Sequence, residues 1–224
     1  MIYDIYEKRK YVRTFDPDYK ISKGLINSLL MQAWKVTPSK NNFMPYKLHV
    51  LGPEHQEYKK AIYINCAGNE AKTDGIDDPL SERYKEILPN YANILSCSYL
   101  MLFTMRFEDK PSVHQKKLMD RGHTFEPAMK EKYLKNYSTV SLEVGLFADA
   151  FSALCLEQDI DVSYTLCFRK ELDTWKDLPF VDEKPVFIMV VGKAKDYLID
   201  KRKREGWDKN DPRPDFDRIV HFVD

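Results

Sequence analysis

The chain has little glycine, and its eight glycines are never spaced as a phosphate-binding loop requires. Neither G-x-G-x-x-G nor a P-loop pattern occurs, and no G-x-S-x-G elbow is present. These absences argue against a dinucleotide-binding fold of the Rossmann type, an NTPase and an α/β-hydrolase.

Cysteine and histidine are also scarce. The four cysteines are widely spaced, without C-x-x-C, and are Cys66, Cys97, Cys155 and Cys167. Because most of them stand among apolar neighbours, we expect core thiols in a reducing cytoplasm. A metal site of His114 and His123 with Asp120 and Glu126 is an alternative, but these residues follow no recognised ligand spacing. We therefore expect a charged surface helix there and no metal.

The chain has no excess of either charge sign, since 35 basic residues balance 35 acidic ones. We therefore expect no nucleic-acid partner. The longest apolar runs, residues 99–103 and 186–191, are far shorter than the roughly 20 residues that span a bilayer. Charge also interrupts the first ten residues, unlike a secretory signal. These features predict buried strands, no membrane segment and a cytoplasmic location.

What the sequence does contain is a regular succession of helical and strand-like segments. Ser22 is placed to cap a helix over residues 21–34, and a wide apolar stripe predicts a central helix over 138–156. Further helices are expected at residues 3–10, 54–64, 80–95 and 172–175. Alternating or continuous apolar residues predict strands at residues 46–51, 98–104, 160–168 and 185–192, and a loop is expected at 67–79.

Three separated polar segments are the candidate binding residues: Arg9-Lys10-Tyr11-Val12-Arg13, Pro38-Ser39-Lys40-Asn41-Asn42 and Pro212-Arg213-Pro214. Guanidinium groups can hold a phosphate in bidentate fashion, and Ser and Asn can bind a polyol chain. Taken singly, each segment is explained as well by a solvated turn or an ordinary loop. Together they could hold a flavin nucleotide.

The order of these segments resembles the nitroreductase family of flavoproteins, which begins R-x-S-x-R/K-x-F and continues P-S-x-x-N-x-Q-P-W. Here the corresponding stretches are Arg9 to Phe15 and Pro38 to Tyr46. The resemblance resumes at the second strand, the central helix, the last core strand and the C-terminal Arg213-Pro214. The sequence departs from the family at Tyr11, Met44, Tyr46 and Cys167, where the family has Ser, Gln, Trp and Gly.

The resemblance implies a site for FMN. It places Arg9 and Arg213 on the phosphate and Arg13, the candidate catalytic residue, beside the pyrimidine end of the ring system. The remaining implied cofactor-binding residues are Lys10, Tyr11, Pro38, Ser39, Lys40, Asn42, Asn90, Tyr164, Thr165 and Leu166. Of these, Ser39 and Asn42 would reach the flavin from a partner subunit. The segment Tyr164 to Phe168 takes the place of the family's P-x-E-G-F, whose backbone amides face the flavin.

The resemblance also implies an α+β fold with a central, mostly antiparallel sheet flanked by helices. We expect one domain over residues 1–224, with 107–136 as a helical lid insertion and 194–224 as a tail crossing to the partner of an intertwined homodimer. The apolar segment at 218–223 independently suggests docking on a second subunit.

The implied activity is reduction of a small acceptor such as a nitroaromatic or a quinone, with NADH or NADPH as donor and ping-pong kinetics. Two alternatives remain open. One is a reductive dehalogenase or a flavin-degrading oxygenase on the same scaffold. The other is a non-catalytic dimeric binding protein that has lost tight FMN binding.

Overall fold

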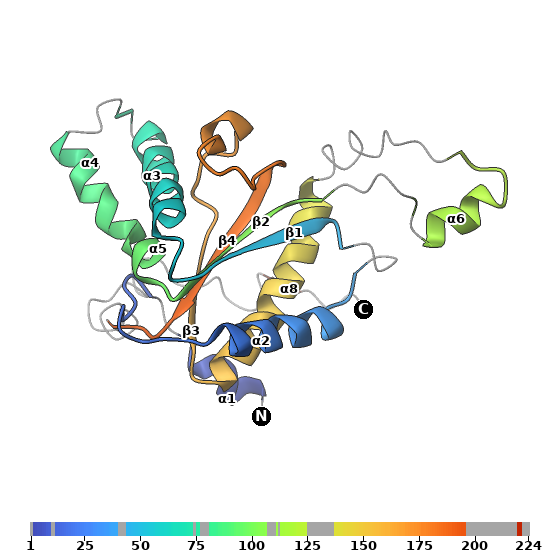
Figure 1. Ribbon diagram of the computed structural model, residues 1–224, viewed down its shortest axis with the longest axis horizontal. Coiled ribbons are helices and arrows are strands. Elements are labelled where there is room, and N and C mark those ends of the chain that lie inside the picture. Colours follow the sequence, from blue (N-terminus) through green and yellow to red (C-terminus); the bar gives the residue numbers. More distant parts are fainter. Residues whose placement is uncertain are drawn as a thin grey trace.

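The computed structural model describes most of the chain, namely residues 2–9, 12–39, 44–73, 75–76, 81–106, 111, 113–124, 137–195 and 219–220. Its regular elements are helices packed around one sheet, as Figure 1 shows. The helices are α1 Ile2–Glu7, α2 Lys23–Val36, α3 Gln56–Thr73, α4 Glu82–Ile87, η2 Leu88–Tyr91, α5 Ala92–Ser96, α6 Val113–Met119, α8 Tyr137–Glu157 and η3 Leu172–Trp175. The strands are β1 Tyr46–Leu51, β2 Tyr99–Met105, β3 Asp161–Thr165 and β4 Pro185–Gly192.

Within the described part of the chain, the sheet has four strands in the order β1-β2-β4-β3, and each neighbouring pair is antiparallel. β2 and β4 lie in the middle, which explains why their sequences are continuously apolar: every residue of β2 is buried. A strand in the middle of the sheet is covered on both faces, so its side chains are apolar on both sides. The α+β fold with a central antiparallel sheet, expected from the resemblance, is confirmed.

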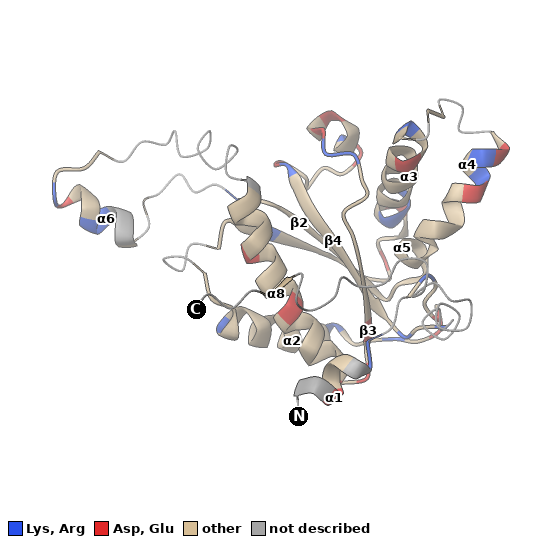
Figure 2. Ribbon diagram, turned by 180° about the vertical axis from the view of Figure 1, so that it is seen from behind, with Lys and Arg blue, Asp and Glu red and all other residues tan. Residues whose placement is uncertain are grey.

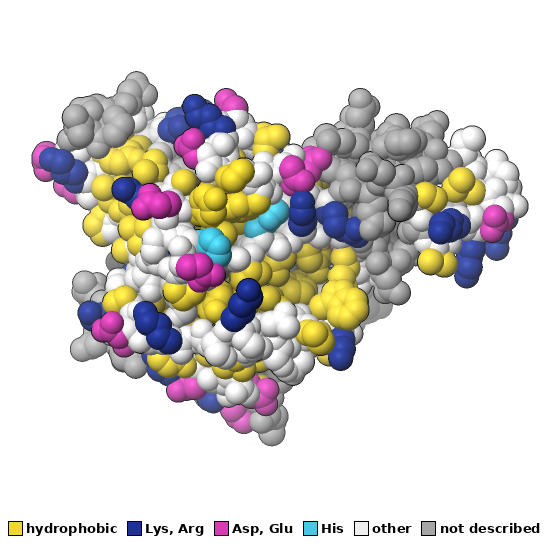
Figure 3. Space-filling model, viewed as in Figure 1, with side chains coloured by type: hydrophobic (Ala, Val, Ile, Leu, Met, Phe, Trp, Pro, Cys, Tyr) yellow, Lys and Arg dark blue, Asp and Glu magenta, His cyan; other side chains and the backbone are white. Residues whose placement is uncertain are grey.

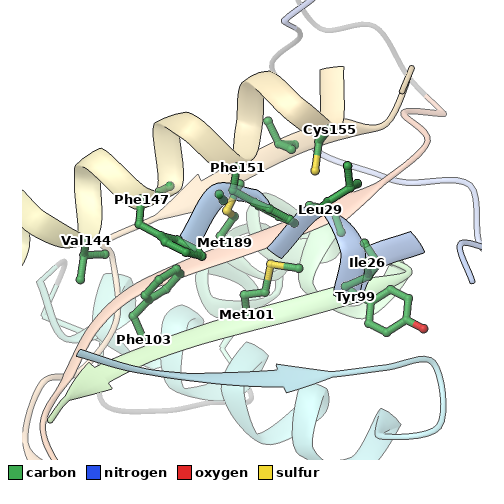
Figure 4. Packing of buried hydrophobic residues seen from close by; sticks show 14 of the residues in the cluster. Ile26, Leu29, Tyr99, Met101, Phe103, Val144, Phe147, Phe151, Cys155 and Met189 are labelled. Carbon is green, nitrogen blue, oxygen red and sulfur yellow. The ribbon is translucent and has the colours of Figure 1, made fainter. Parts of the chain in front are cut away.

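Helices cover both faces of the sheet, and side chains alternate between the two cores. From β2, Met101 and Phe103 enter the core under α2 and α8, whereas Leu100 and Leu102 enter the core under α3 and α5. Figure 4 shows Met101, Phe103 and Met189 directed toward Phe147 and Phe151 of α8. The period of two along each strand therefore assigns successive residues to opposite cores.

α8 is the central helix that the sequence predicts. Val144, Phe147 and Phe151 pack on the sheet, and the Phe103 and Phe147 rings lie 5.8 Å apart between centroids. By length and composition α8 could cross a membrane, but half of its apolar window is buried inside the fold. Its opposite side leaves Leu142 and Leu146 exposed.

Two details of the helical predictions are wrong. The loop expected from residue 67 begins later, because α3 continues to Thr73 with Ala67 and Ala71 buried against neighbouring elements. The helix expected over 80–95 is interrupted at Pro89, where the chain forms the short 3₁₀ turn η2. Proline lacks an N–H and suits the start of a helical turn, so the chain tightens there.

The segment expected to form a lid is described only at residues 111 and 113–124. It contains α6, which Figure 1 shows projecting away from the sheet. The predicted tail is described at residues 194–195 and 219–220. Near its start, Ala194 forms an isolated bridge with Phe15, and the Ala194 N–H donates to Oδ2 of Asp161 at 2.8 Å.

Candidate functional site

The N-terminal segment and the end of β3 meet through Arg9 and Tyr164. The Arg9 guanidinium carbon lies 4.8 Å from the centre of the Tyr164 ring, a cation–π geometry. The ring is supported from behind by Phe187 of β4, and the phenol shares a 2.6 Å hydrogen bond with Ser152 of α8. Burial raises the pKa of Tyr164, so the phenol stays protonated. The Tyr164 ring is therefore held in a fixed position against the exposed guanidinium of Arg9.

Arg13 is held by the turn that precedes α5. Its Nη1 donates to the backbone carbonyl of Asn90 at 2.8 Å, and the Asn90 side chain donates to Oε1 of Glu70 at 3.3 Å. Burial and the hydrogen bond to Glu70 raise the pKa of Tyr91 above its ordinary value, which keeps that phenol a donor. The guanidinium of Arg13 is therefore fixed by backbone that itself is tied to α3.

Asn93 of α5, which sequence reasoning missed, connects the helical turn that follows Asn90 to the N-terminal segment and to β3. Its Nδ2 donates to the carbonyl of Val12 and to Oγ of Ser163, at 3.1 Å each, and the side chain is buried. Asn93 lies one helical turn after Asn90, and this spacing was the one sequence signal available for it. The structure thus brings together Arg9, Arg13, Asn90 and the 164–167 segment.

The segment after β3 is exposed between Thr165, where the strand ends, and the buried Phe168. Thr165 accepts a hydrogen bond at Oγ1 from the N–H of Cys167 at 3.1 Å, and Leu166 is 57% exposed. The expectation that all four cysteines are core thiols is wrong for Cys167, which is exposed. The reason is local: the chain leaves the sheet at Thr165 and turns inward again only at Phe168, whose ring packs edge-on against Trp175.

Ser39 occupies a different place. Its Oγ donates to Oε2 of Glu143 at 2.6 Å and accepts from the N–H of Met44 at 2.8 Å. Glu143 lies in the N-terminal half of α8, whereas Ser152, which bonds to Tyr164, follows nine residues later, a rise of roughly 13 Å. Within one chain, the structure does not bring Ser39, or the neighbouring exposed Pro38, to Arg9 and Tyr164.

The other predicted binding residues, Lys10, Tyr11, Lys40, Asn42 and Arg213, lie outside the described residues, so their positions stay predictions.

The helix before Ser39, α2, and the helix to which Ser39 bonds, α8, both carry exposed apolar side chains. Met31 and Trp34 of α2 are 48% and 56% exposed, and Leu142 and Leu146 of α8 are 64% and 41% exposed. A groove of about 460 Å³ lies there, lined in part by Leu30, Met31, Trp34, Met44 and Phe147. Figure 3 shows apolar side chains gathered over α2 and β1, and Figure 2 shows few charges on α2 and α8.

Comparison with solved structures shows the same fold in three bacterial proteins. One is assigned as an NAD(P)H:FMN oxidoreductase from Staphylococcus epidermidis, with 16% identity, a TM-score of 0.66, and coverage of 100% of this chain and 96% of that one. A BluB-like flavoprotein from Clostridium difficile has 14% identity, a TM-score of 0.65 and coverage of 100% and 99%. A protein assigned as a nitroreductase from Exiguobacterium sibiricum, solved in complex with FMN, has 16% identity, a TM-score of 0.62 and coverage of 100% and 97%.

Among curated proteins, no sequence matches this chain. The model of the nitroreductase family, however, matches residues 6–193, which include the described site segments around Arg9, Arg13, Asn90 and Tyr164. The chain therefore belongs to the nitroreductase family.

Proposed function

We propose that this chain is an FMN-dependent oxidoreductase whose flavin lies against Arg9, Arg13, Asn90 and the 164–167 segment. The observation that carries the proposal is the convergence of these three segments, which are remote in sequence, around two guanidinium groups and one exposed loop. The FMN complex of the Exiguobacterium sibiricum protein supports it at the level of the shared fold.

The residues present fit a flavin nucleotide in their donor chemistry. Arg9 is exposed and can turn its guanidinium to a phosphate, a contact in which Arg213 would share. Arg13 is fixed through Asn90 and would face the pyrimidine end, where its positive charge favours the reduced form. The exposed backbone at Leu166 and Cys167 would lie along the ring edge, although Cys167 brings a Cβ where the family has glycine.

FMN, when bound, supplies the redox chemistry, so the chain needs no acid/base dyad. We propose NADH or NADPH as donor and a small acceptor, such as a nitroaromatic or a quinone, that occupies the same face after the donor leaves. The chain's own contribution is to bind, orient and stabilise charge. We propose a cytoplasmic location for this activity.

A second copy of the chain completes the proposed site. Ser39 stands apart from Arg9 and Tyr164 on one chain, and it bonds to α8, which exposes Leu142 and Leu146, while α2 exposes Met31 and Trp34. A homodimer that buries these side chains would remove exposed apolar area from water and bring the partner's Ser39 toward the flavin. Leu142→Glu together with Leu146→Glu is expected to give monomers in light scattering and to weaken FMN binding. Dimers with unchanged affinity would contradict this arrangement.

The primary test is FMN binding to the purified full chain. We expect a yellow preparation, and FMN fluorescence quenching should show Arg9→Ala and Arg213→Ala each weakening the affinity about tenfold, the usual effect of removing one charge-assisted hydrogen bond. Arg13→Ala should mainly slow reduction by NADH or NADPH. Arg83→Ala is the matched control, because Arg83 is exposed on α4 and pairs with Glu86.

A colourless protein that ignores added FMN refutes the proposal and favours a binding protein on the same scaffold. Full flavin occupancy in Arg213→Ala would show that the tail does not reach the phosphate. Flavin that binds but is reduced by neither NADH nor NADPH would support the proposed cofactor site and refute the proposed reaction.

A further inference from the structure

A cavity of about 760 Å³ lies between α3, Tyr84 of α4 and the segment 169–178, apart from the residues of the proposed flavin site. This volume is within the range of about 300–1,000 Å³ typical of small-molecule sites. Its wall on the α3 side includes Tyr58, Ile64 and Gly68, and its opposite wall includes Arg169 and Trp175.

Arg169 is the unusual residue of this cavity. Its backbone N–H donates to Oδ1 of Asn65 at 2.9 Å, which fixes the residue against α3. The guanidinium donates from Nη2 to the carbonyl of Gly68 at 3.1 Å, while Nε is buried and has no hydrogen-bond partner among the described residues. A charged group with a buried, unsatisfied donor is costly, and an anion in the cavity would stabilise the guanidinium through its charge even without contacting Nε.

Gly68 makes this position possible. A Cβ at residue 68 would stand 3.2 Å from Nη2 of Arg169, closer than most Cβ contacts, and 3.4 Å from Cζ. Glycine inside a helix lowers stability by about 0.5–1 kcal/mol relative to alanine. At residue 68 this loss is accompanied by the space that the flat guanidinium of Arg169 occupies. Arg169 therefore lies with one face on the helix backbone.

The other walls suit a planar, apolar body. Ile64 is 51% exposed although it lies on the cavity wall, and the half-buried Tyr58 and Tyr84 present aromatic surface around it, while Trp175 is 2% exposed. Trp175 is held in place because its Nε1 donates to the carbonyl of Arg169 at 2.7 Å. Aromatic side chains offer large apolar area at small entropic cost.

The charged residues of the cavity lining balance only when Arg169 is included. Glu57, Asp173 and Asp177 are matched in number by Lys60, Lys176 and Arg169, so without Arg169 the lining has one acid in excess. Outside the cavity lining, exposed Glu171 has its pKa lowered by backbone hydrogen bonds and, less strongly, by the charges of Lys72 and Arg169. The preference for an anion therefore depends on Arg169, whose charge stands beside apolar walls and not in open solvent.

We propose that this cavity binds a planar organic carboxylate, with its ring between Ile64, Tyr58 and Tyr84 and its carboxylate on the guanidinium of Arg169. The site is separate from the flavin site, and its occupation requires no redox step.

The test uses isothermal titration calorimetry on the full chain with naphthalene-2-carboxylate and its neutral analogue 2-naphthamide. Both probes have the same ring system, so the difference in affinity isolates the carboxylate. We expect the carboxylate to bind at least about tenfold more tightly, and Arg169→Gln to abolish that preference while leaving the amide within about twofold. Lys176→Gln, which removes another cation of the cavity, is expected to keep the preference.

If Arg169→Gln does not fold, as judged by circular dichroism, Ile64→Glu takes its place. This substitution leaves Arg169 intact, lies on an exposed helical position and puts a carboxylate in the cavity, so it should weaken carboxylate binding more than amide binding. Equal binding of the two probes, no binding at concentrations on the order of 1 mM, or an unchanged preference in the folded variant overturns the proposal. Displacement of the carboxylate by FMN would overturn its separation from the flavin site.

Discussion

Lys59 is a fully buried cation in the second turn of α3, and its replacement by methionine should destabilise the protein. Its Nζ donates to the carbonyls of Cys97 at 2.9 Å and Ser98 at 3.3 Å, at the point where α5 ends and β2 begins. Methionine fills similar volume but leaves both carbonyls without this donor. At about 1–3 kcal/mol for each unsatisfied group, less the gain from no longer burying a charge, we expect a loss of about 2–4 kcal/mol.

The pH dependence gives a sharper test. Desolvation lowers the pKa of Lys59 in the folded protein below its ordinary value, so the unfolded chain binds more protons between the two pKa values. The free energy of unfolding that depends on Lys59 must therefore rise as the pH increases from the pKa of the folded state toward that of the unfolded state. Because Lys59→Met cannot titrate, the stability difference between wild type and variant should widen as the pH approaches 10.

Urea unfolding followed by circular dichroism between pH 7 and about pH 10 measures both effects. Lys60→Met is the control, because Lys60 is the next residue on α3 and is exposed. A difference that stays constant or shrinks with rising pH would refute a lowered pKa, and a loss equal to that of Lys60→Met would refute the structural role of the two hydrogen bonds.

Two further substitutions test the packing around the site. Gly192→Ala should lower stability by about 1–3 kcal/mol in thermal unfolding, because the new Cβ would stand 2.7 Å from Cδ1 of the fully buried Phe15. Gly24→Ala, where no heavy atom lies within 4 Å of the Cβ, should cost nothing, and equal losses would show that the Phe15 contact is not the cause. Tyr164→Phe removes the hydrogen bond to the buried Ser152 and should lower stability by about 1 kcal/mol, whereas Tyr6→Phe, which removes an exposed bond to Asp149, should cost less. A larger loss in Tyr6→Phe would contradict that ranking.

Elements with strong local signals could be predicted from the sequence. The bounds of β1 and β4 agree with the structure, since a proline or glycine marks their ends, and Ser22 caps α2 by accepting from the N–H of Leu25 as expected. α3 was predicted too short because a glycine and polar residues near 68–73 resemble a loop. The reason that Gly68 stands in a helix is Arg169, about a hundred residues away, which no local pattern reveals.

The same limit applies to the candidate site. Arg9, Arg13 and Asn90 belong to recognisable segments, but Asn90 is held by Glu70, and the backbone before Arg13 is held by Asn93, which also bonds to Ser163. Those residues have no motif of their own. Their roles depend on which strand lies beside which turn, and that follows from the register of the sheet and not from spacing along the chain.

If the proposed homodimer forms, the distance along α8 between Glu143, which binds Ser39, and Ser152, which binds Tyr164, predicts a form of subunit complementation. If each flavin takes Arg13 from one chain and Ser39 from the other, a chain with Arg13→Ala paired with a chain with Ser39→Ala forms one doubly altered site and one intact site. Random mixing of two individually impaired variants would then restore about one quarter of the sites. Activity recovered from two defective proteins would show that the unit of function is divided between chains.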